Sequence, residues 1–118
     1  AQADEYVSQA EGGFRHYFHY LRTLEAKRNM MDATVQEREE FVAARVNEAL
    51  EDQVIAGDAD TVLDRLIAYR EEVGPFGTLL MTGHDWDDKD LWRGSMRRLA
   101  EDVMPRLSQH AEVTDPRY

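Results

Sequence analysis

The chain has 118 residues, enough for one small domain, and 24 acidic against 14 basic side chains give a net charge of −10, which disfavours binding to nucleic acid or anionic membranes. The absence of cysteine excludes disulfides, thiolate catalysis and cysteine-ligated metal centres. No apolar run is long enough to span a membrane and the first residues carry no secretory signal pattern, so we expect a cytoplasmic protein.

The first part of the chain predicts an arm over residues 1–12 and a helical region over 13–52. The first helix of that region carries one apolar stripe with the spacing of a buried face. Its members are Phe14, Tyr17, Phe18, Leu21 and Leu24. A second helix is expected from about residue 35 to 50, because Thr34 and Glu37 have the spacing of a capping box.

The second part predicts alternating strands and helices. Residues 53–57 form a short apolar run typical of a strand, and residues 59–73 have helical spacing and end at Gly74, a C-cap. Residues 76–82 are apolar on both side-chain faces, which indicates a strand buried on both sides. A strand, a helix and a second strand in this order are typical of a parallel α/β sheet.

A last helix is expected from Asp88 or Lys89. Its apolar positions keep helical spacing as far as Leu107, and Pro105 should kink or end it. Residues 53–107 would then be consecutive βαβα units, and residues 108–118 a polar tail. Two parallel strands cannot form a stable sheet alone, so the chain looks like the end of a larger α/β protein.

Ligands of parallel α/β sheets bind beyond the carboxyl ends of the strands. His84, Asp85 and Trp86 follow the predicted strand 76–82 directly. His84 could transfer a proton and Trp86 could stack on a ligand. The alternative is a structural turn, in which His84 bonds a backbone carbonyl, Asp85 or Asp87 caps the last helix and Trp86 packs.

Several ordered motifs resemble the C-terminal end of luciferase-like flavin monooxygenases, most closely the limonene-monooxygenase-like branch. The similarity spans roughly residues 10–110 and is strongest over 57–107. The motifs are Gly-Asp-Ala-Asp-Thr-Val (57–62), Glu-Glu-Val-Gly-Pro-Phe-Gly-Thr-Leu-Leu (71–80), Gly-His-Asp-Trp (83–86), Ser-Met (95–96), Val-Met-Pro-Arg-Leu (103–107) and the aromatic helix Gly-Phe-Arg-His-Tyr-Phe (13–18).

This resemblance implies that the chain is the C-terminal portion of a (β/α)8 TIM barrel, mostly helical with two or three short strands. It implies reduced FMN and O2 as co-substrates, a small apolar substrate, and a homo-oligomer. His84 and Trp86 would line the rim of the flavin pocket. A barrel of this kind needs about 250 residues, so the 118 residues alone are not expected to be active.

Two further patterns have simpler explanations. His16 and His19 lie three residues apart on a helix, a spacing that allows a shared metal, but no third ligand of the right type is evident apart from Glu11 and Glu25, so no metal site is predicted. The acidic run from Asp85 to Asp90 lacks the spacing of a calcium loop and suits a helix N-terminus.

The sequence therefore leaves two functions open. In the first, the chain completes an FMN-dependent monooxygenase. In the second, it is a small, mainly helical module whose aromatic stripe from Phe14 to Leu24 mediates self-association or protein binding without catalysis.

Overall fold

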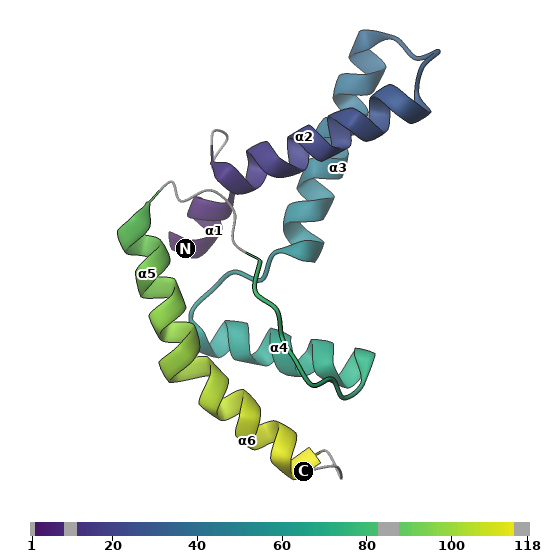
Figure 1. Ribbon diagram of the computed structural model, residues 1–118. Coiled ribbons are helices and arrows are strands. Elements are labelled where there is room, and N and C mark those ends of the chain that lie inside the picture. Colours follow the sequence, from purple (N-terminus) through teal and green to yellow (C-terminus); the bar gives the residue numbers. More distant parts are fainter. Residues whose placement is uncertain (1, 9–11, 83–87, 115–118) are drawn as a thin grey trace. The chain divides into compact units, whose positions relative to one another are not determined.

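The computed structural model describes residues 2–8, 12–82 and 88–114, and every regular element in these ranges is a helix (Figure 1). The chain forms two compact units, Ala1–Ile55 and Ala56–Tyr118. The elements are α1 (Gln2–Ser8), α2 (Gly13–Asn29), α3 (Val35–Gln53), α4 (Ala59–Val73), α5 (Lys89–Arg98), the π-helical turn η1 (Leu99–Val103) and α6 (Met104–Thr114).

The first unit is a helical hairpin of α2 and α3, which lie side by side in Figure 1. Its core contains Phe18 and Ala26 of α2 and four residues of α3, of which Val46 is only 1% exposed. The short helix α1 contacts α2, where the Tyr6 and Phe14 rings meet edge to face at 6.3 Å. The packing of one apolar face of each helix therefore holds this unit together.

Hydrogen bonds fix the connection between the two helices of the hairpin. The Thr34 hydroxyl accepts from the Glu37 backbone N–H (3.2 Å), and the Thr34 N–H donates to the Glu37 carboxylate (2.7 Å), so the predicted capping box is confirmed. The Arg38 guanidinium donates to the carbonyls of Met30 (3.3 Å) and Ala33 (2.9 Å). The turn is thus held at both helix ends.

The second unit packs α4 against η1 and α6. Its core consists of Leu63 and Leu66 of α4 with Val103 and Leu107. The predicted helix over 59–73 is confirmed with both its ends, and Gly74 follows it as the C-cap, donating its N–H to the Arg70 carbonyl. At the surface of this unit, Arg106 and Asp60 form an ion pair of 2.6 Å.

The predicted α/β fold, a C-terminal portion of a (β/α)8 barrel with short strands at 53–57 and 76–82, is wrong. Gln53 is the last residue of α3, and neither 54–57 nor 76–82 pairs with another segment within the described residues. A strand needs a neighbour for its backbone groups. Of residues 79–81, Leu79 packs on the core of the second unit, whereas Leu80 is 83% exposed.

Pro105 neither ends nor interrupts the last helix. The chain passes from α5 through η1 into α6 without a break, and the Met104 N–H bonds to the Leu99 carbonyl, five residues back. This wider turn directly precedes Pro105, which has no N–H to donate. The helix continues to Thr114, beyond the end at residue 107 that the sequence indicated.

Gly74 should be harder to replace than Gly77 in the second unit. Its φ of 91° and ψ of 177° lie in a region that only glycine occupies readily, whereas Gly77 has open space around its Cα and no positive φ. We expect Gly74→Ala to lower the free energy of unfolding by about 1–3 kcal/mol. Gly77→Ala should change it by less than about 0.5 kcal/mol. Urea unfolding followed by circular dichroism measures both, and equal effects would contradict the assignment.

Asp58 links the stability of the second unit to pH. Its carboxylate accepts from the Thr61 backbone N–H at 2.8 Å, and this bond, with a second from the Thr61 side chain, holds the pKa of Asp58 below its ordinary value of 3.8. Because the folded-state pKa is depressed, the stabilisation is complete well above pH 3.8 and is lost as the pH falls through the folded-state pKa.

The matched variant is Asp58→Asn, which keeps an oxygen acceptor at the cap and does not titrate. Between about pH 5 and pH 2 it should lose less unfolding free energy than the wild-type chain. Asp58→Ala should lack the cap at every pH. Denaturation curves collected across this range test the expectation, and parallel losses in the wild-type and Asn chains would contradict it.

Candidate interaction surface

The aromatic stripe of α2 divides between two faces of the helix. Phe18 is buried and Phe14 partly buried against α3, as the sequence predicted. The prediction is wrong for the other members of the stripe, which are exposed. The exposed apolar residues are Tyr17, Tyr20, Leu21 and Leu24, and we call this set the outer face of α2.

The four residues of the outer face occupy positions i, i+3, i+4 and i+7, so they form one continuous strip along the helix. Tyr20 is 58% exposed and Leu24 is 47% exposed. Tyr20 is not a member of the apolar stripe that the sequence predicts for this helix. The sequence does indicate that some aromatic residues of this helix lie outside its core face, because residues 14–20 contain four aromatic side chains, more than one side of a helix can hold.

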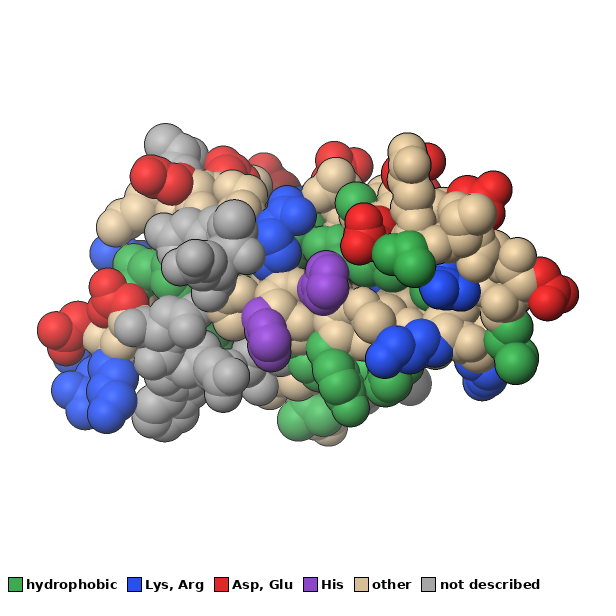
Figure 2. All heavy atoms as spheres, turned by 90° about the horizontal axis from the view of Figure 1, so that it is seen from above, with side chains coloured by type: hydrophobic (Ala, Val, Ile, Leu, Met, Phe, Trp, Pro, Cys, Tyr) green, Lys and Arg blue, Asp and Glu red, His purple; other side chains and the backbone are tan. Residues whose placement is uncertain are grey.

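The two helices of the hairpin differ in charge. Helix α2 carries four basic residues and one acidic residue, Glu25, which forms an ion pair with Arg22 (2.9 Å). Helix α3 carries six acidic and two basic residues. The aromatic helix is therefore basic within a chain whose net charge is −10. Figure 2 shows hydrophobic side chains next to the histidines, with Lys and Arg close by.

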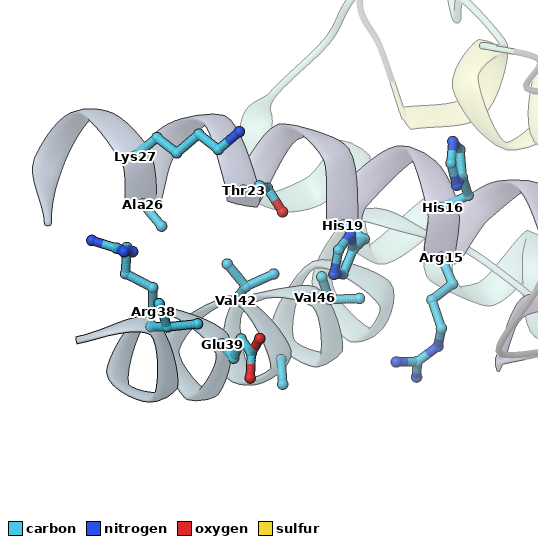
Figure 3. Close-up of a pocket in the computed structure, with 12 residues that line it drawn as sticks. Arg15, His16, His19, Thr23, Ala26, Lys27, Arg38, Glu39, Val42 and Val46 are labelled. Atoms are coloured by element: carbon cyan, nitrogen blue, oxygen red, sulfur yellow. The ribbon is translucent and has the colours of Figure 1, made fainter. Parts of the chain in front are cut away.

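A groove of about 660 Å³ runs between α2 and α3 beside the outer face. Figure 3 shows His19 and Thr23 pointing from α2 towards α3, and Val42 and Val46 pointing from α3 towards α2. Its lining residues are Arg15, His16, His19, Thr23, Ala26, Lys27, Val35, Arg38, Glu39, Val42, Ala43 and Val46. The groove thus has an apolar floor with charged side chains around it.

The basic side chains of the groove lie at both of its ends. Lys27 and Arg38 lie near one end and Arg15 near the other (Figure 3). Arg15 donates from Nη2 to Asn47 (3.1 Å), while its Nε is buried without a hydrogen-bond partner. Glu39 is the one acidic lining residue among the described residues. The local charge is therefore positive.

The structure does not bring His16 and His19 together as a metal site. His19 points towards α3, whereas His16 points away from it (Figure 3). In residues 2–8, 12–82 and 88–114, no group of three or more His, Asp or Glu side chains could hold a metal ion. The two histidines are exposed neighbours of the aromatic residues on α2.

The predicted flavin-site residues His84 and Trp86, together with Asp85, lie outside the described residues, so their role stays a prediction. Asp88, two residues after Trp86, has a structural role. The Asp88 carboxylate accepts from the backbone N–H groups of Asp90 (3.1 Å) and Leu91 (2.9 Å) and so caps α5, a role predicted from the sequence for Asp85 or Asp87.

Within the described part of the chain, no helix combines the length and the apolar character needed to cross a membrane. Comparison with protein-family models, curated proteins and solved structures gives no match to this chain.

Proposed function

We propose that the chain is a helical interaction module that self-associates through the outer face of α2. The observation that carries this proposal is the exposed strip of two tyrosines and two leucines, spaced for a helix partner on the side of α2 away from its own core. Such a face stabilises a protein when a second helix covers it, because each large apolar side chain removed from water contributes about 1.5–3 kcal/mol.

The distribution of charge favours a second copy in antiparallel orientation. In that pairing Tyr17 meets Leu24 of the second copy and Tyr20 meets its Leu21. Arg28, near the C-terminal end of α2, then approaches the N-terminal end of the second α2. In each copy this end contacts α1, which carries Asp4 and Glu5 (Figure 1). Opposite charges therefore meet at both ends of the pair.

The size of the contact sets its expected strength. Helix α2 has 17 residues and is about 25 Å long. A single helix pair of this length buries less than the roughly 1,600 Å² of a standard interface. We therefore expect a weak dimer, with a dissociation constant in the micromolar range or above.

Substitution of Leu24 tests the proposal. Leu24→Lys should weaken dimerisation at least about tenfold, because it removes an apolar contact and places a charge among the basic side chains of both copies. Sedimentation equilibrium of the wild-type and variant chains measures this directly. Val113→Lys is the matched control, since Val113 is 82% exposed on α6 and the charge change is the same.

Charge reversal tests the orientation in the same assay. Arg28→Glu alone should weaken the dimer, and combination with Asp4→Lys and Glu5→Lys should restore part of the loss. A wild-type chain that stays monomeric at millimolar concentration, or equal effects of Leu24→Lys and Val113→Lys, would overturn the proposal.

A second function is favoured by the segment between α4 and α5. Residues 79–82 belong to no regular element, and Leu80 and Met81 are exposed. These residues follow helix α4, and the residues around the start of α4, Gly57 to Thr61, are part of the monooxygenase-like motif. Position 57 of this motif requires glycine, because a Cβ there would lie 2.7 Å from the Thr61 side chain. As a segment of an FMN-dependent monooxygenase, the chain would have these apolar residues covered by further polypeptide.

This second function predicts flavin binding by the natural gene product. Titration of that protein with FMN, followed by flavin fluorescence, should show saturable binding that His84→Ala and Trp86→Ala each weaken. Leu80→Ser should also reduce binding if the segment packs inside the assembled enzyme. A gene product of natural length that binds no oxidised or reduced FMN would eliminate this function.

A further inference from the structure

We propose that the groove between α2 and α3 binds an acidic amphipathic helix of a partner protein. This site differs from the self-association surface, because its walls come from both helices of the hairpin and its occupant is another protein. The inference rests on the apolar floor, the position of the basic side chains and the length of the groove.

The floor of the groove can receive apolar side chains. Ala26, Val42 and Val46 form its base and also belong to the hairpin core, so they are held in place by packing. Thr23 and Ala43 border this base and are small. A partner helix with large apolar residues on one face would rest on this base and cover the exposed lining residues Ala43 and Val35 without displacing any core residue.

The charges of the groove select an acidic occupant. Arg15 lies at one end of the groove and Lys27 and Arg38 at the other, and among the described lining residues only Glu39 is acidic. Arg15 and Arg38 are already oriented by hydrogen bonds to Asn47 and to the turn carbonyls, so little side-chain freedom is lost on binding. A basic occupant would place like charges together at both ends.

The spacing of these charges favours a helix over a small amphiphile. From Arg15 to Lys27 the groove follows α2 for twelve residues, about 18 Å. A carboxylate with one head group could pair with one end only. A partner helix of about twelve residues spans the same distance and can present Asp or Glu at both ends, with apolar side chains between them.

The full chain and a synthetic peptide test the proposal. The probe is a labelled, acetylated and amidated 14-residue peptide with leucines at i, i+3, i+4 and i+7 and glutamates at both ends. Fluorescence anisotropy should report saturable binding that weakens as salt is raised, since the charges at both ends are screened. The same peptide with lysines in place of the glutamates should bind at least about tenfold more weakly.

Two neighbouring alanines provide matched variants. Ala43 lines the groove, whereas Ala44 does not, and both are exposed on α3. Ala43→Glu should weaken peptide binding at least about tenfold, because it adds a bulky negative charge to the site. Ala44→Glu carries the same charge on the same helix and should bind within about twofold of the wild-type chain.

Three results would overturn the proposal: equal affinity for the acidic and basic peptides, equal effects of the two alanine variants, and displacement of the peptide by dodecanoate with similar affinity. The last would assign the groove to a single-headed amphiphile. Leu24→Lys lies outside the groove lining and should leave peptide binding intact while it reduces self-association. The two proposals can therefore be overturned independently of each other.

Discussion

The packing of α2 on α3 around Val46 determines which surfaces the first unit offers to a partner. Once Phe18 and Ala26 face α3, the helical repeat directs Tyr17, Tyr20, Leu21 and Leu24 to the other side of α2. The same contact opens the groove, because small residues at 26 and 43 leave space between the two helices. Both candidate sites thus follow from one helix pair.

Both candidate surfaces involve the basic helix α2, although the net charge of the whole chain is −10. The excess of acidic residues is largest on the partner helix α3, while α2 has only Glu25 to offset its four basic residues. A net charge describes the average field of a protein and not the field at one face. An acidic chain can therefore carry a local surface that attracts acidic partners.

The helices could be predicted from the sequence where local signals define their ends. Asp58 and Gly74 bound α4, and Thr34 with Glu37 begins α3; each of these caps involves residues close in the chain. Local signals could not decide whether residues 53–57 and 76–82 form strands, because a strand depends on a neighbour elsewhere in the chain, and neither segment has one within the described residues. The division of the α2 stripe into buried and exposed residues was missed for a related reason. A pattern of apolar residues does not show how much surface of the neighbouring helix is present to cover them.

The π-helical turn between α5 and α6 also changes how one long helix can be used. A turn closed by a bond over five residues contains one residue more than an α-helical turn, which rotates the following face by about 100°. Val103 at the end of the turn and Leu107 beyond it are buried against α4, whereas α5 before the turn has no buried residue. Met96, which precedes the turn, is 50% exposed, so the packing on α4 is concentrated in η1 and α6, and α5 keeps a half-exposed apolar side chain outside that contact.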